Sequence, residues 1–107
     1  METVKVPTDA TLKRHGLDVA SWGRILQRQG FACGICGKVP KSRILNIDHQ
    51  HVRGYKDMPA EQKRRYHRGL LCFQCNRHIV SRVATPAKLR AGAEYLEAYE
   101  VRKAELA

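Results

Sequence analysis

The strongest hydrophobic pattern lies in residues 16–30, GLDVASWGRILQRQG, where apolar side chains recur every three or four positions. This spacing places them on one face of a helix, with polar side chains on the other. Asp18 is a suitable N-cap, and Gly30 suits the turn that follows the last helical residue. The pattern predicts an amphipathic helix between these two residues, with its buried side formed by Val19, Trp22, Ile25 and Leu26.

Two shorter apolar runs predict strands. SRILNIDH, residues 42–49, and RGLLC, residues 68–72, are both too short for a typical helix. We expect them to pair as an antiparallel hairpin around a long loop over residues 50–67. Gly54 and Pro59 interrupt regular structure in that loop, although PAEQKRRYH could form one or two helical turns.

The C-terminal third predicts helices. NRHIVSRV, residues 76–83, contains no helix breaker and follows the last cysteine. Thr85 and Pro86 form an N-cap and first-turn signature, which predicts a helix from Pro86 towards Lys103. This helix could support a homodimer, but packing onto its own domain is the more frequent use of an apolar face. We therefore expect a buried side formed by Leu89, Ala93, Leu96 and Tyr99.

A length of 107 residues allows one small domain. Residues 1–11 are polar and without periodicity, so they predict a flexible arm, and residues 12–107 predict a single domain. No apolar run reaches the ~18 residues of a membrane span, and the first residues lack a signal-peptide pattern. We expect a cytoplasmic protein without membrane contact.

The four cysteines form two Cys-x-x-Cys pairs, Cys33 with Cys36 and Cys72 with Cys75. A small core needs an additional staple, which two disulfides or one metal site could supply. A reducing compartment disfavours disulfides, and two matched pairs can give zinc its four tetrahedral thiolates. We expect a structural Zn²⁺ site. The 35 residues between the pairs exceed the common zinc-ribbon spacing, so they hold a sizeable insert.

Positive charge is concentrated in the middle of the chain. Between Phe31 and Arg90, thirteen Lys or Arg residues accompany three acids, and this excess equals the whole net charge of +10. Such a focused charge favours a polyanionic partner, and DNA is the first candidate. The side chains that we expect to contact the phosphate backbone lie in or directly after the long loop: Arg53, Lys56, Lys63, Arg64, Arg65 and Arg68. Tyr55 and Tyr66 either stack on unpaired bases or anchor the loop.

The insert between the cysteine pairs also carries candidate chemistry. The first predicted strand ends at Asp48 and His49, and Asn76 directly follows Cys75. Asp48 and Asn76 can offer oxygen ligands to a hard divalent cation, and neutral His49 can take a proton from an attacking water. This set suits phosphodiester hydrolysis. His67 we expect to contact DNA or solvent, and His15 we expect to have no role.

Several motifs together resemble one family. CGIC, IDHQH, VRG and RGLLCFQCN, with the preceding helix, are similar to the recombination endonuclease VII family, a zinc-bearing branch of the HNH nucleases of bacteriophages and prophages. The resemblance implies an α+β fold, in which a ββα-metal (His-Me finger) core is stapled by the four-cysteine zinc site and flanked by N- and C-terminal helices. One position departs from the family's best known member, which has a glutamate where this chain has Ile79.

The resemblance also implies roles for individual residues. Asp48 and Asn76 would hold catalytic Mg²⁺ or Mn²⁺, His49 would activate water as the general base, and His51 would assist at the phosphate. The implied enzyme is a DNA endonuclease that leaves 5′-phosphate and 3′-hydroxyl ends in a bacterial host cell. A second hypothesis is a zinc-stapled nucleic-acid-binding module without catalysis, in which Asp48 and His49 have structural roles.

Overall fold

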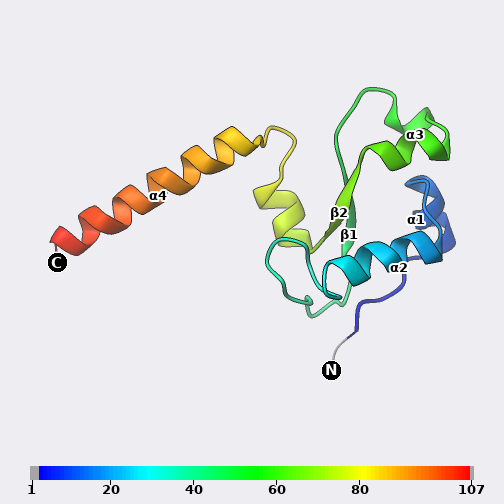
Figure 1. The fold of residues 1–107 in the computed structure, drawn as a ribbon, viewed down its shortest axis with the longest axis horizontal. Coiled ribbons are helices and arrows are strands. Elements are labelled where there is room, and N and C mark those ends of the chain that lie inside the picture. Colours follow the sequence, from blue (N-terminus) through cyan, green and yellow to red (C-terminus); the bar gives the residue numbers. More distant parts are fainter. Residues whose placement is uncertain (1–2, 107) are drawn as a thin grey trace.

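A computed structural model describes residues 3–106 (Figure 1). It combines helices with a two-stranded antiparallel sheet and a cluster of four cysteines. In chain order the elements are α1 (Asp9–Arg14), α2 (Val19–Arg28), β1 (Asn46–His49), a 3₁₀ turn (Tyr55–Asp57), α3 (Ala60–Arg65), β2 (His67–Leu71), a π-helical turn (Cys75–Ile79) and α4 (Pro86–Leu106).

The sheet confirms the predicted antiparallel pairing, but β1 begins only at Asn46 and residues 42–45 are not part of the strand. Strand β1 pairs antiparallel with β2, with Ile47 opposite Leu70 and Asp48 opposite Gly69. The register then shifts, so that His49 lies opposite His67 instead of Arg68. A bulge of this kind redirects side chains at the end of a strand. It therefore determines where His49 points.

Helix α2 begins and ends as the sequence predicts. The carboxylate of Asp18 accepts a hydrogen bond from the Ser21 amide at 2.7 Å, and the Ser21 hydroxyl accepts one from the Asp18 amide at 3.0 Å. This reciprocal capping box satisfies two amides that the first helical turn leaves free. Gly30 follows the helix with φ of 70°, a conformation that favours glycine. Trp22 and Leu26 face the core, as expected, and Ile25 packs against its edge, but Val19 is exposed at the start of the helix, contrary to the prediction.

The core lies between α2 and the sheet and includes the buried cysteines. Leu70 of β2 is completely buried, and Val4 packs against the edge of the cluster. The segment expected to be a flexible arm thus differs from the prediction over its described part. The Lys5 amide donates to the Arg43 carbonyl at 2.7 Å, and α1 begins already at Asp9.

Helix α4 extends away from the body of the molecule (Figure 1). The expected burial of its apolar side is wrong, because Leu89, Leu96 and Tyr99 are all exposed. Apolar residues are spread around this helix instead of forming one continuous stripe, so no single face can be buried. Within residues 3–106, no helix combines the length and apolar character that crossing a membrane requires.

The side chain of Gln29 connects the end of α2 to β2. Its amide oxygen accepts from the Leu70 amide at 2.8 Å, and its amide nitrogen donates to the carbonyls of Leu70 at 2.8 Å and Ala32 at 2.9 Å. A Cβ atom at Gly69 would lie 2.8 Å from the Gln29 oxygen, so the absence of a side chain there allows this contact. The Gln29 side chain thus pairs with the backbone groups of Leu70 that a third strand would otherwise bond.

We expect Gln29→Ala to destabilise the zinc-loaded protein by about 1–3 kcal/mol, because the buried Leu70 amide loses its partner. The measurement is chemical denaturation. Gln27→Ala is the matched control: Gln27 is exposed on the same helix, and its loss should change the unfolding free energy by no more than about 0.5 kcal/mol. Equal effects of the two substitutions would contradict the role given to Gln29.

Candidate functional site

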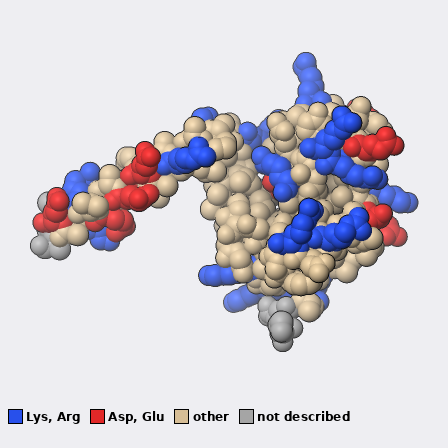
Figure 2. Space-filling model, viewed as in Figure 1, with Lys and Arg blue, Asp and Glu red and all other residues tan. Residues whose placement is uncertain are grey.

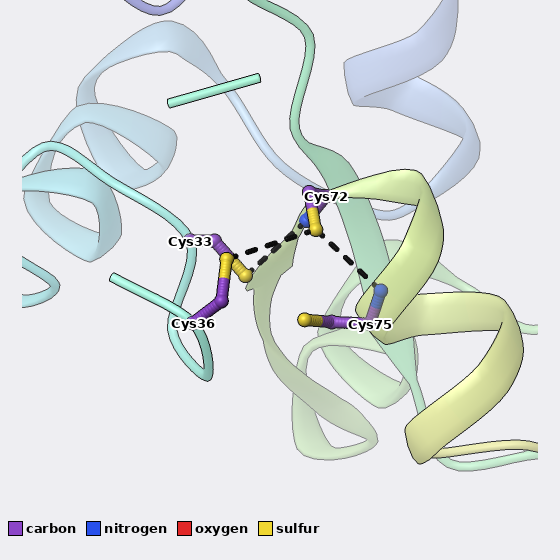
Figure 3. Close-up of side chains that lie close together, drawn as sticks. All are labelled: Cys33, Cys36, Cys72 and Cys75. Atoms are coloured by element: carbon purple, nitrogen blue, oxygen red, sulfur yellow. Dashed lines mark hydrogen bonds between the residues drawn. The ribbon is translucent and has the colours of Figure 1, made fainter. Parts of the chain in front are cut away.

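The four cysteines meet at one point (Figure 3). Cys33 and Cys36 come from the turn after α2, whereas Cys72 and Cys75 come from the end of β2 and the start of the π-helical turn. All four sulfur atoms lie within 4.8 Å of one another, and those of Cys36 and Cys72 are 3.9 Å apart. A tetrahedral zinc site with bonds of about 2.3 Å has sulfur–sulfur edges of about 3.8 Å. The cluster therefore fits a structural zinc site, as predicted.

Backbone amides donate hydrogen bonds to two of these sulfur atoms. The Cys33 sulfur accepts from the amides of Cys72 at 3.4 Å and Ile35 at 3.5 Å, and the Cys72 sulfur accepts from the Cys75 amide at 3.5 Å. Burial alone would raise the pKa of the Cys33 thiol, but these donors outweigh it and lower the pKa to about 6. Amide donors of this kind stabilise thiolates, which are the form that binds zinc.

Asp48 is buried in β1 and bound by an arginine of β2. The Arg68 Nε donates to one carboxylate oxygen at 2.8 Å, and its Nη2 donates to the other at 3.1 Å. Asp48 is 5% exposed, so its charge requires a partner of this kind. Arg68 was expected to contact DNA, but the structure directs its guanidinium to Asp48.

His49 lies within a group of aromatic rings. The ring of Tyr55 stacks on it with centroids 3.9 Å apart and planes 9° from parallel. The His51 ring is 5.1 Å away and the His15 ring 5.5 Å away. His15 Nδ1 is 3.0 Å from the Tyr55 hydroxyl, which joins α1 to the loop that follows β1. The stacked Tyr55 thereby restricts the orientation of the His49 imidazole.

The surroundings of these histidines favour neutral rings. Burial is the main reason why the pKa of His49 is lowered, and nearby His51 adds to it while Asp48 opposes it. Burial also lowers the pKa of His15 to about 4, with further contributions from His49 and nearby cations. The pKa of His67 falls mainly through burial, and its Nε2 is buried without a hydrogen-bond partner among the described residues. His67 is thus less accessible than expected.

The two residues expected to share a divalent cation line different hollows. Asp48 lines one of about 300 Å³ together with Arg68 and Gly69. Asn76 lines another of about 570 Å³ together with His15 and Ile47. The structure thus brings the cysteines together and places His51 beside His49, but Asp48 and Asn76 line different hollows.

On the face that Figure 2 shows, basic side chains are scattered over the body of the molecule, and basic and acidic ones are interleaved along α4. Three of the six predicted DNA contacts are exposed without a protein partner among the described residues: Arg53, Lys56 and Arg65. Lys63 is buried and donates to the Arg14 carbonyl at 2.9 Å, and Arg64 donates to the Gly16 carbonyl at 2.7 Å. Lys63 therefore anchors α3 against the turn between α1 and α2.

Two residues of this site were missed or left open by sequence reasoning. His15 was expected to have no role, and Tyr55 was assigned either to base stacking or to anchoring. Their contact joins positions 40 residues apart in the sequence, and no local pattern announces it. The only signal was the presence of aromatic residues in a strongly basic loop.

A four-cysteine centre beside a strand that carries an acid and a histidine defines a small metal-binding domain. The family model for recombination endonuclease VII matches residues 10–98. The chain therefore belongs to the recombination endonuclease VII family, which the motifs predicted. Membership implies a nuclease and points to DNA as its partner. Comparisons with curated proteins and with solved structures found no match.

The low pKa of His15 predicts a pH-dependent stability. Its pKa is about 4 in the folded protein and 6.5 ordinarily, so between these values the unfolded chain binds a proton that the folded chain does not. The part of the folding stability that depends on a neutral His15 is therefore fully present above about pH 6.5 and is lost as the pH falls towards 4. In His15→Gln, which keeps a polar partner for Tyr55, we expect a smaller loss of melting temperature between pH 7.5 and 5.5.

The quantity compared is the difference in melting temperature between His15→Gln and the unaltered protein. Both proteins carry the same cysteines, so acid-driven zinc release affects them equally. An equal fall in melting temperature for the two proteins between pH 7.5 and 5.5 would contradict the assigned environment of His15.

Proposed function

We propose that this protein is a divalent-metal-dependent DNA endonuclease that hydrolyses phosphodiester bonds through an HNH-type, ββα-metal core. In this proposal β1, β2 and the π-helical turn form the core, and the zinc centre holds their ends together. The observation that carries it is the family match over residues 10–98, which includes Asp48, His49, His51 and Asn76. We further propose that the enzyme acts in the cytoplasm of a bacterial host and is encoded by a phage or prophage.

His49 is the proposed general base. Its ring is partly accessible, and burial favours the neutral form that can accept a proton. Tyr55 stacks on one face of the imidazole, which keeps a ring nitrogen available at the ring edge. His49 takes a proton from the attacking water, the bond between phosphorus and the 3′-oxygen breaks, and the released 3′-oxygen takes a proton from a second water to become the hydroxyl, which leaves the phosphate on the 5′ end. His51, 5.1 Å away and exposed, assists at the phosphate.

Asp48 and Asn76 are the proposed ligands for Mg²⁺ or Mn²⁺. They line different hollows in the structure, so the proposal includes a movement of their side chains towards each other when the ion binds. Their carboxylate and amide oxygens are the donors that such ions prefer. A bound ion would stabilise negative charge on the phosphate. In the structure Arg68 donates to both oxygens of Asp48, which fixes the orientation of the carboxylate. Arg68 is itself partly exposed, at 39% of its side chain, so its guanidinium can transfer from Asp48 to an incoming phosphate.

DNA binding is assigned to the exposed basic residues of the loop after β1 and of α3. Arg53, Lys56 and Arg65 contact the phosphate backbone, with Arg64 beside them. Contacts of this type hold a duplex in place without reading its sequence. Lys63, which is buried and donates to the Arg14 carbonyl, supports this surface from beneath in the proposal.

The test is cleavage of supercoiled plasmid by the zinc-loaded protein with Mg²⁺ or Mn²⁺, compared with His49→Ala. We expect the variant to lose roughly 10²–10⁴-fold in nicking rate, the usual contribution of a general base, while its DNA affinity stays within about twofold. Gln50→Ala is the matched control, because Gln50 is the exposed neighbour of His49 and its side chain is given no catalytic role. It should cleave like the unaltered protein.

The alternative, a zinc-stapled binding module without catalysis, gives a different result. There the unaltered protein binds DNA tightly and with strong salt dependence, but neither it nor any variant nicks the plasmid. The bidentate hold of Arg68 on Asp48 is the observation that favours this alternative, because it gives the acid a structural role.

A further inference from the structure

A hollow of about 570 Å³ lies between residues 5–15, strand β1 and Asn76, and it is called the N-terminal hollow below. Its volume falls within the range of ligand sites, ~300–1,000 Å³. Polar and charged side chains on its wall include Lys5, Arg14, Thr11 and Asn46. Within the part of the chain that the structure describes, no acidic residue lines it. The lining therefore suits an anionic ligand that also has polar and apolar parts.

The wall of this hollow is held in place by the protein itself. The Lys5 amide donates to the Arg43 carbonyl at 2.7 Å, and Arg43 Nε donates to the Thr3 carbonyl at 2.8 Å. The Thr8 side chain caps α1 by accepting from the Thr11 amide at 3.3 Å. These bonds fix residues 3–11 beside β1, so the N-terminal hollow exists before any ligand arrives.

Two cations at the hollow have no partner within the described chain. Among residues 3–106, neither the Lys5 ammonium nor the Arg14 guanidinium makes a hydrogen bond or an ion pair. Only the backbone carbonyl of Arg14 is used, as the acceptor from Lys63. By contrast, the nearby arginines 43, 64 and 68 all donate to protein oxygens. Lys5 and Arg14 are therefore available to an external anion.

The N-terminal hollow lies next to the proposed general base. His15 lines it, and the His15 ring lies 5.5 Å from that of His49. Asn76, a proposed ligand of the divalent cation, lines it as well. A DNA strand whose scissile phosphate lies at His49 would therefore have a neighbouring nucleotide within reach of the hollow.

We infer that the N-terminal hollow is a DNA-binding subsite that holds a nucleotide next to the scissile phosphate. Lys5 and Arg14 bind its phosphate, and Thr11 and Asn46 offer hydrogen bonds to its sugar and base. This inference rests on the proposed function for the position of the cleaved bond. It extends the DNA-binding surface from the loop after β1 to α1 and the segment that precedes α1.

The test compares Arg14→Ala with Lys13→Ala. Both residues are exposed in α1 and both changes remove one positive charge, but Lys13 lines a separate hollow with Leu17 and Asp18. The full-length, zinc-loaded protein carries His49→Ala so that DNA stays intact, and binding to a fluorescein-labelled duplex is measured by anisotropy at several salt concentrations. We expect Arg14→Ala to weaken binding about fivefold more than Lys13→Ala and to reduce the salt slope by about 0.9.

Arg14→Lys, which keeps the charge, should restore most of the affinity, and unchanged melting temperatures should show that each variant is folded. Equal loss of affinity in Arg14→Ala and Lys13→Ala would overturn the inference, because general electrostatics would then explain both. This outcome is distinct from failure of the proposed function, because the anisotropy assay needs no cleavage and plasmid nicking by the unaltered protein is scored separately.

Discussion

The rest of the structure depends on the convergence of four cysteine sulfurs from two distant segments. The first pair ends the turn after α2 and the second pair ends β2, with 35 residues between them. A domain of this size buries too little apolar surface to hold such an insert by packing alone. A zinc ion held by all four thiolates would close this loop and anchor both ends of the insert. Strand β1, with Asp48 and His49, lies inside it.

The candidate chemistry is then divided between two hollows. Asp48 points to Arg68, whereas Ile47 and Asn76 line the N-terminal hollow. The bulge after Asp48 sets His49 opposite His67, among the rings of His15 and Tyr55. In the proposed function Arg68 has two successive partners, the buried carboxylate and an incoming phosphate. A guanidinium suits both because its planar fork binds either anion in the same bidentate manner.

Features encoded by local sequence could be predicted, and features that depend on tertiary contacts could not. The bounds of α2 follow from Asp18 and Gly30, which act through neighbouring backbone groups, and the cysteine centre follows from spacing alone. Lys63 looked like a surface cation, but its ammonium reaches the Arg14 carbonyl 49 positions away. Helix α4 was predicted correctly as a helix, but its packing was not, because helical propensity does not fix what a helix contacts.

The most direct test of the zinc centre's role is a zinc titration of metal-free, reduced protein, followed by the fluorescence of Trp22, the one tryptophan, and by far-ultraviolet circular dichroism. Trp22 is 4% exposed in the structure, so its emission reports formation of the core. We predict that the metal-free chain is largely unfolded, that folding is complete at one zinc per chain, and that Cys36→Ser abolishes this stoichiometric transition. A metal-free chain with a buried Trp22 and an unchanged melting temperature would contradict this role.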